Sequence, residues 1–310
     1  MKLLKHHLAT IAATMAIGLT GFMAGAANAA QPTPWQMGMQ PAATTVMEDI
    51  RWFNDFTLII MAGVTVFVAL LLLVVIIRFR KKANPTPSRT SHNTMIEVVW
   101  TVVPILILVM ISVPSFRLLF KQLDIPEYEM TIKATGYQWY WGYEYADEGM
   151  EDVSFDAYML EDASELAKDN YNQSREALKP NEPRLLAADY NIVVPVDTTV
   201  RVQVTAGDVI HSFAVPAFGI KIDAVPFRLN ETWFRADNTG MFYGQCSELC
   251  GTRHAFMPIA VQVVTKEQYQ AWAEAARSDI DEANTLLANL IADEKKVAAT
   301  AATDVKVVSR

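Results

Sequence analysis

Five side chains in the second half of the chain have the chemistry of metal ligands. The twelve-residue segment CSELCGTRHAFM supplies Cys246, Cys250, His254 and Met257, and His211 lies 35 residues before the first cysteine. Thiolate, imidazole and thioether groups together suit copper better than magnesium or calcium, which prefer oxygen ligands. The spacing therefore predicts a copper site built from one compact loop and one more distant histidine.

The number of cysteines favours two metal ions over one. A mononuclear blue copper site uses one cysteine, two histidines and a weakly bound methionine, whereas this segment has two cysteines. Two thiolates can each bridge two metal ions, so one loop can hold a pair of coppers. An electron shared between two bridged coppers causes little geometric rearrangement, which suits rapid electron transfer better than catalysis on a substrate.

Other uses of the same residues remain open at this point. Cys246 and Cys250 could form a disulfide in an oxidising compartment. A zinc site could use both cysteines with His211 and His254, although it would leave Met257 without a role. Met257 could also be a core residue, since methionine fills irregular gaps in protein interiors.

The region around these residues has the pattern of an all-β domain. Short runs rich in β-branched and aromatic residues alternate with Pro, Gly, Asn and Asp, which is typical of a β-sandwich or barrel. These runs cover residues 129–145, 191–204, 211–225, 232–246 and 257–264. We expect the sequence Asp-Asn-Thr-Gly at 237–240 to form a turn.

Three further segments of this region differ from the strands. Residues 161–180 are polar and predict an inserted surface excursion, with a helix-like patch around 164–168. Residues 267–288 predict a helix. The tail from Ala298 is rich in Ala, Thr, Val and Lys, and we expect it to be disordered.

Two uncharged apolar runs before the β region predict membrane-spanning helices. Residues 56–77 and 98–116 contain 22 and 19 residues without a charge, and about 20 residues span a bilayer core. Both runs are apolar on all sides, unlike the amphipathic helices of soluble proteins. The connector 78–95 has five basic residues and no acidic one, so we expect it in the cytoplasm and both flanking regions outside.

The first 30 residues predict an export signal. Basic residues precede an apolar run from Leu8 to Met23, and small residues at 27–29 form a cleavage site. The mature protein would begin near Gln31. An uncleaved anchor is the alternative, but this apolar run is short and contains Gly and Thr, which argues against a spanning helix.

Charge is distributed unevenly along the chain. Residues 1–117 contain 9 Lys and Arg and 4 Asp and Glu (net +5), whereas residues 118–310 contain 17 and 30 (net −13). The acidic exported half should attract a basic partner and repel nucleic acid. Glu97, at the cytoplasmic start of the second apolar run, could mark a functional site or simply favour the helix N-terminus.

Four segments resemble subunit II of haem–copper cytochrome c oxidase. CSELCGTRHAFM is similar to the CuA motif of that family. GYQWYWGYEY at 136–145 resembles its aromatic stretch, HSFAVPAFGIKIDAVPFRLN at 211–230 its first-histidine segment, and IEVVWTVVP at 96–104 the start of its second helix. The resemblance extends over most of the chain, with an interruption near 161–180.

The resemblance implies a fold, a division of the chain and a function. The fold would be a two-helix transmembrane hairpin plus an all-β cupredoxin-like sandwich or barrel. The chain would divide into a signal peptide (1–30), an exported N-terminal segment (31–55), two transmembrane helices (56–117), a CuA domain (118–275) and a C-terminal helix with a flexible tail (276–310). It would carry electrons from cytochrome c through CuA to haem in subunit I, where oxygen is reduced to water in a proton-translocating complex.

The resemblance also implies a ligand set. One copper would take His211, both cysteines and Met257. The other would take both cysteines, His254 and the backbone carbonyl of Glu248. The side chain of Glu248 would face a magnesium ion shared with subunit I.

Five further residues acquire roles by resemblance, and none of them is catalytic in this chain. Trp139 would be the entry point for electrons from cytochrome c. Glu144, Asp189 and Asp208 would belong to the face that docks cytochrome c, and Glu97 would stand at the mouth of a proton pathway. The partners would be subunits I and III, cytochrome c and the bacterial inner membrane, which the chain would cross twice with both termini on the periplasmic side.

One residue departs from the family pattern. Phe227 replaces the glycine usual in a Pro-Gly-Arg stretch, and we expect a local backbone change near the site. Two other functions compete with electron transfer: a copper-free subunit of a quinol oxidase, and a copper-carrying module outside any oxidase. The five metal-ligand side chains argue against the first, and the two helices with Glu97 argue against the second.

Overall fold

The computed structural model describes residues 29–308, except 87, 167, 169–171 and 181. Most of the predicted export signal therefore lies outside the described residues. Its last two residues form a short strand, β1 (Ala29–Ala30), that pairs in parallel with Met241 and Phe242.

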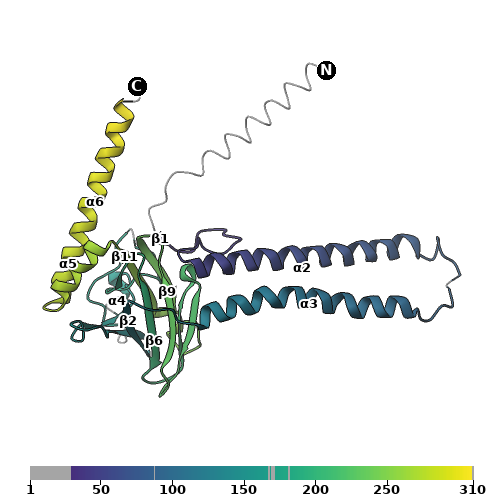
Figure 1. Ribbon diagram of the computed structural model, residues 1–310, viewed down its shortest axis with the longest axis horizontal. Coiled ribbons are helices and arrows are strands. Elements are labelled where there is room, and N and C mark those ends of the chain that lie inside the picture. The colour runs from purple at the N-terminus through teal and green to yellow at the C-terminus, as the bar shows by residue number, and fades with distance from the viewer. Residues whose placement is uncertain (1–28, 87, 167, 169–171, 181, 309–310) are drawn as a thin grey trace.

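Two long helices leave the β domain side by side (Figure 1). The helices α2 (Thr45–Arg78) and α3 (Thr94–Leu123) have 34 and 30 residues, enough at 1.5 Å per residue to cross a bilayer core of about 30 Å. The uncharged runs 56–77 and 98–116 lie within them. Their large apolar side chains are mostly exposed, as expected for helices whose solvent is lipid.

The start of α2 packs against the β domain. Thr44 caps the helix, because its Oγ1 accepts a hydrogen bond from the backbone N–H of Met47 (3.0 Å), and it donates to the carbonyl of Phe218 (2.8 Å). Gly219 adopts φ +71°, and a Cβ there would lie 2.7 Å from Cδ1 of Ile50. A glycine is therefore needed where the helix touches the domain.

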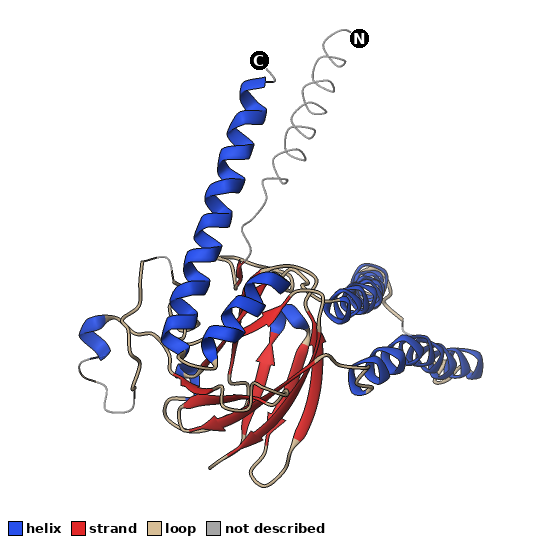
Figure 2. Ribbon diagram, turned by 60° about the vertical axis from the view of Figure 1, so that its left-hand side comes forward, coloured by secondary structure: helices blue, strands red, loops and turns tan. Residues whose placement is uncertain are grey.

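The β domain is built from two main sheets and a hairpin (Figure 2). One sheet has the order β4-β3-β2-β6-β9 and the other β1-β10-β11-β5, while β7 and β8 pair with each other. The strands are β2 (Met130–Tyr137), β3 (Tyr140–Tyr145), β4 (Ser154–Ala157), β5 (Ile192–Pro195), β6 (Thr199–Ala206), β7 (His211–Val215), β8 (Ile220–Ala224), β9 (Asn230–Arg235), β10 (Gly240–Gln245) and β11 (Pro258–Val264).

The predicted strand runs are confirmed, with turns inside several of them. The run 129–145 is a hairpin, β2–β3, whose turn residues are Gln138 and Trp139. The run 211–225 is the hairpin β7–β8, interrupted by a short 3₁₀ helix, η1 (Pro216–Phe218). The predicted turn at 237–240 connects β9 to β10. These turns bring Trp139 and His211 to strand ends.

Aromatic side chains fill the space between the sheets and a C-terminal helix. Trp141, Tyr143 and Tyr145 point inward from β3 and are almost completely buried. The hydroxyl of Tyr145 bonds the backbone of Val193 in the other sheet at 3.0 and 2.9 Å. Trp272 of α5 (Lys266–Ala276) lies with its ring 5.3 Å from that of Tyr145. The helix thus closes one side of the core.

The C-terminal region differs from the prediction in two ways. The expected helix 267–288 is divided into α5 and α6 (Ile280–Val308). Asp279 at the break accepts hydrogen bonds from the first backbone N–H groups of α6 at 2.8 and 2.9 Å, as a helix cap does. The helix α6 continues to Val308, through an alanine-rich stretch that favours helix, where the sequence predicts a disordered tail from Ala298.

In its described residues, the polar excursion 161–180 has one short helix, α4 (Ala163–Leu166), near the predicted helix-like patch. The N–H of Leu178 donates to the carbonyl of Glu161 (2.9 Å), which closes the excursion at its base. The Nδ2 of Asn172 donates to the carbonyl of Met159 (2.8 Å), which attaches the excursion to the domain.

Candidate metal centre

Two segments far apart in the sequence meet to form the centre. His211 is the first residue of β7, and residues 246–257, here called the copper loop, connect β10 to β11. The N–H of Ser247 donates to the carbonyl of Ser212 (3.1 Å), and the N–H of Cys246 donates to the carbonyl of Met257 (3.3 Å). Backbone hydrogen bonds therefore close the loop and join it to β7.

The donor atoms of all six predicted copper ligands lie close together. The two Sγ atoms are 3.8 Å apart, and Cys246 Sγ is 3.9 Å from His211 Nδ1 and 3.3 Å from the carbonyl oxygen of Glu248. Cys250 Sγ is 3.5 Å from both His254 Nδ1 and Met257 Sδ. Folding thus brings two thiols, two imidazoles, a thioether and a carbonyl into one small volume.

Both cysteines are free and buried, which disfavours the disulfide alternative. Met257 is 1% exposed and points its sulfur at Cys250, so a four-ligand zinc site would leave a well-placed thioether unused. Soft sulfur donors together with imidazoles suit copper. The donor set in this structure therefore fits the predicted copper pair.

The two thiols are not equivalent. Burial raises the pKa of the Cys246 thiol, but hydrogen bonds from His211, the backbone and His254 outweigh burial and lower this pKa to about 7. Burial raises the pKa of the Cys250 thiol, and the neighbouring Cys246 raises it further. Because the thiolate is the metal-binding form, the two imidazoles around Cys246 favour the state in which it binds a metal.

An acidic residue orients the first histidine. His211 is fully buried, and its Nε2 lies 2.9 Å from Oδ1 of Asp208. That bond leaves Nδ1 to face the thiols, and a carboxylate in this position fixes the tautomer and ring orientation of a metal-binding histidine. Asp208 also accepts from the N–H groups of Gln138 (2.7 Å) and Val209 (2.6 Å). Burial raises the pKa of Asp208, but these bonds outweigh it and the net shift is downward.

Trp139 lies directly against the copper loop. Its Nε1 donates to the carbonyl of Cys250 (3.2 Å), and the Nε2 of Gln138 donates to the same oxygen (2.8 Å). Gly251 has φ +120°, and a Cβ there would lie 3.0 Å from the ring of Trp139. The indole is partly exposed, so one ring connects the protein surface with a cysteine of the centre.

The three predicted docking acids occupy different environments. Glu144 is half exposed on β3 and pairs with Lys133 at 2.8 Å. Asp208 is one-third exposed beside His211. The side chain of Asp189 is only 1% exposed, and it accepts hydrogen bonds from backbone N–H groups of Tyr158 and Tyr190. Burial raises the pKa of Asp189. Its carboxylate is committed to the interior, which does not favour a direct docking contact.

Glu97 lies far from the metal centre, in the first turn of α3 at the end of the helical hairpin away from the β domain. The structure therefore does not bring it together with the other predicted site residues. The acid is partly exposed, and its position agrees with both interpretations made from the sequence.

Phe227 has an uncommon backbone conformation for a residue with a side chain. It adopts φ +63°, the left-handed conformation that a glycine enters without steric cost, and its side chain is fully exposed. The position therefore has a conformation that favours glycine, and the ring lies in solvent.

Sequence reasoning missed the orienting role of Asp208 and one ion pair of the copper loop. Asp208 precedes His211 by three residues, a spacing that could have suggested the contact. Arg253 pairs with Glu161 at 2.6 Å. No local signal indicates this pair, because 92 residues separate the partners.

Comparison with known proteins assigns both halves of the chain to one family. Residues 130–264 match "Cytochrome C oxidase subunit II, periplasmic domain", the CuA-binding domain, and residues 32–118 match the transmembrane domain of the same subunit. The chain is therefore a two-pass membrane protein.

Two relatives support the same family assignment. A probable cytochrome c oxidase subunit 2 of Rickettsia bellii is 52% identical over 244 residues, covering 79% of this chain and 85% of the relative. Cytochrome c oxidase subunit 2 of Cereibacter sphaeroides is 48% identical over 286 residues, covering 88% and 93%. The crystal structure of the periplasmic domain of CoxB of Bradyrhizobium japonicum is 51% identical, with a TM-score of 0.43, covering 51% of this chain and 99% of that domain. The chain belongs to the cytochrome c oxidase subunit II family.

Proposed function

We propose that this chain accepts electrons from cytochrome c at a two-copper centre and passes them to haem in subunit I of the oxidase. The convergence of six donor atoms, two of which are the sulfurs of free, buried cysteines, carries the proposal. When bound, the copper pair supplies a centre that gains and loses one electron. The protein holds the donors in place, excludes water from the thiols and keeps the imidazoles oriented.

Each residue has a part in this proposal. Cys246 and Cys250 would each bind both coppers. His211 and Met257 would complete one copper, and His254 with the carbonyl of Glu248 the other. That carbonyl points toward Cys246 while the residue as a whole is exposed, which leaves its carboxylate available for a magnesium ion at the boundary with subunit I.

Electrons would enter through Trp139. Its hydrogen bond to the carbonyl of Cys250 gives a short path of bonded atoms from the surface to a copper ligand. Glu144 and Asp208 would help dock a basic cytochrome c, since both are accessible from solvent and the exported region is acidic. Asp189 would support this face from inside through its bonds to Tyr158 and Tyr190.

The chain would operate in the bacterial inner membrane with subunits I and III. The basic connector would be cytoplasmic, and the β domain and both termini periplasmic. Residues 1–30 would serve as a cleaved signal, 31–55 as the exported N-terminal segment, 118–275 as the CuA domain and 276–310 as a C-terminal helix with a flexible tail. Glu97 would then lie at the cytoplasmic side, at the mouth of a proton pathway.

Copper analysis with absorption and electron paramagnetic resonance spectra tests the proposal. The fragment for this test runs from Asp124 to Arg310. It keeps α6, because Trp272 donates a hydrogen bond to Asn284 of α6 (3.0 Å) and a fragment that ended before α6 would lose that contact. We expect two coppers per chain and a purple, mixed-valence spectrum. One copper with a blue-type spectrum, or zinc alone, would falsify the proposal. A chain that binds no copper would instead favour the copper-free quinol oxidase subunit.

A further inference from the structure

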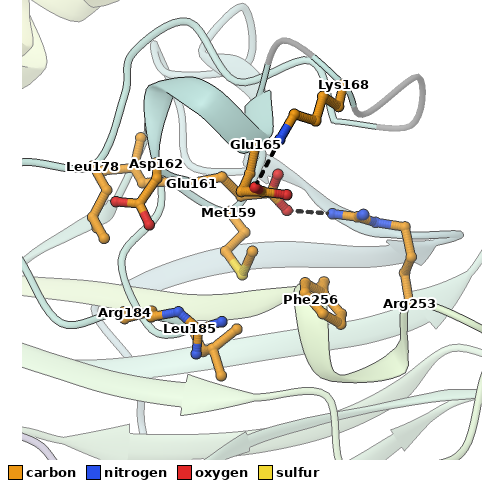
Figure 3. A pocket seen from close by; sticks show the side chains of 11 residues that line it. Met159, Glu161, Asp162, Glu165, Lys168, Leu178, Arg184, Leu185, Arg253 and Phe256 are labelled. Atoms are coloured by element: carbon orange, nitrogen blue, oxygen red, sulfur yellow. Dashed lines mark hydrogen bonds and ion pairs between the residues drawn. The ribbon is translucent and has the colours of Figure 1, made fainter.

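The ion pair between Glu161 and Arg253 joins the polar excursion to the copper loop. The Nη2 of Arg253 lies 2.6 Å from Oε1 of Glu161, and the side chains of Glu161 and Arg253 are 9% and 17% exposed. Figure 3 shows the pair at the wall of a pocket of about 460 Å³ between the two segments. Breaking a buried pair leaves an uncompensated charge, so such a pair strongly restrains the two segments it connects.

Glu161 and Arg253 each lie in segments that make further contacts. Glu161 follows Leu160, whose N–H donates to the carbonyl of Ala187 (2.9 Å), and the carbonyl of Glu161 accepts from Leu178 (2.9 Å). Arg253 lies with its guanidinium carbon 4.7 Å above the ring of Phe256. The pair therefore connects an anchored backbone on one side with a stacked side chain on the other.

Arg253 directly precedes a proposed copper ligand. His254 begins the 3₁₀ turn η2 (His254–Phe256), whose N-terminal end has no hydrogen bond from a capping side chain. The turn is closed by backbone bonds from His254 to Gly251 (3.1 Å) and from Phe256 to Arg253 (2.8 Å). Arg253 thus precedes η2 directly and its carbonyl accepts one of the two closing bonds, so the ion pair connects the excursion to this turn.

We propose that the Glu161–Arg253 pair is a positioning device for His254: the excursion holds η2 so that Nδ1 of this histidine faces the sulfur of Cys250. The inference rests on the proposed role of His254 as a ligand. It gives the excursion a function within the electron-transfer subunit, namely to support the half of the centre that no strand supports.

A merely structural pair predicts different results from a positioning pair. Removing one partner leaves a buried charge and lowers stability in either case. Replacing both partners by apolar residues of similar volume removes that penalty and restores stability. If the pair also positions His254, the double variant should be as stable as the wild type but should still differ from it in the copper spectrum and in the rate of copper loss.

The experiment uses the full chain in the assembled oxidase and three variants: Glu161→Gln, Arg253→Met and the double variant Glu161→Leu/Arg253→Met. The measurements are unfolding temperature, the electron paramagnetic resonance spectrum of the copper pair and the rate of copper loss to a chelator. We expect all three variants to lose copper about 10-fold faster, the magnitude typical of groups that orient metal ligands, and the double variant alone to regain the wild-type unfolding temperature.

The matched control removes another ion pair from the same excursion. Glu165 and Lys168 lie 3.1 Å apart but are 62% and 70% exposed, and Figure 3 shows them beside the same pocket. Glu165→Gln/Lys168→Met should leave copper release and spectrum unchanged. Equal effects in this control, or a wild-type spectrum and release rate in Glu161→Leu/Arg253→Met, would overturn the positioning role. A wild-type oxidase without paired-copper signals would contradict the proposed function instead.

Discussion

The two histidines of the metal centre are supported in different ways. His211 begins a strand, is fully buried and is oriented by the carboxylate of Asp208 at 2.9 Å. His254 lies on a short 3₁₀ turn, is partly exposed and follows Arg253, which is held by an ion pair. One imidazole is therefore placed by the sheet itself, and the other by contacts between a loop and an inserted segment.

This difference shows that a single centre can have one half preformed by the core and one half that depends on peripheral contacts. Strand β7 is paired along its length with β8, whereas η2 lies within the loop that connects β10 to β11. Substitutions on the two sides should therefore differ in kind. Those near His211 should act through hydrogen bonding to the ring, and those near His254 through displacement of the turn.

The largest effect should come from the cysteines, because they connect the two halves. Cys246→Ser and Cys250→Ser should each abolish the two-copper centre, since each thiolate would bind both ions. Metal analysis and the absorption spectrum measure this directly. Ser247→Ala is the control, because Ser247 lies in the same loop and its hydroxyl bonds only the carbonyl of Gln245 in the described structure. Two coppers and a normal spectrum in Cys250→Ser would show that the bridging assignment is wrong.

The next largest effect should come from Asp208 and should be confined to the His211 half. Asp208→Asn keeps the size of the side chain but removes the charge that orients the imidazole. We expect copper affinity to fall by about 10-fold, measured by titration against a competing chelator. Asp197→Asn, which removes an exposed acid paired with Arg235 at 3.2 Å, should have no such effect. Unchanged affinity in Asp208→Asn would mean that the strand alone fixes His211.

Trp139 contacts the metal centre through its hydrogen bond to the carbonyl of Cys250. Trp139→Phe should slow electron entry from cytochrome c and leave copper content unchanged. The stability cost should be about 1 kcal/mol, the value of one hydrogen bond, because Gln138 still donates to the same carbonyl. Stopped-flow reduction of the copper centre at low ionic strength gives the rate. An unchanged rate would remove Trp139 from the electron path.

The smallest effect should come from Glu144, the docking acid that touches neither histidine. Glu144→Gln should raise the apparent KM for cytochrome c about two-fold at low ionic strength, since an exposed charge pair contributes about 0.2–1 kcal/mol. The effect should fade as salt shortens the screening length to about 8 Å. Glu274→Gln, an exposed acid on α5, is the control in steady-state kinetics over a salt series. Equal effects from both variants would mean that net charge alone matters.

The sequence was informative where the signal is local. Five of the six donors lie within twelve residues, so the copper loop could be recognised without a structure, and the uncharged runs predicted both helices of the membrane hairpin. The pair Glu161–Arg253 could not be predicted, because only the packing of the excursion on the loop brings the residues together. The length of α6 was missed because alanine-rich polar tails are compatible with both helix and disorder. Burial of Asp189 was also missed, since an acid next to a strand is usually solvated.

The contact between α2 and η1 has a consequence for distance. Thr44 at the start of α2 bonds the carbonyl of Phe218, and η1 follows directly after β7. At about 3.3 Å per residue, His211 lies about 13 Å along β7 from Val215. The contact therefore connects α2, through η1, to the strand that carries His211. A shift of α2 by one turn, about 5.4 Å, would change the separation of the metal centre from any haem at a fixed depth in the membrane. Electron transfer slows steeply with separation, so a helix cap remote from the metal helps to determine the rate.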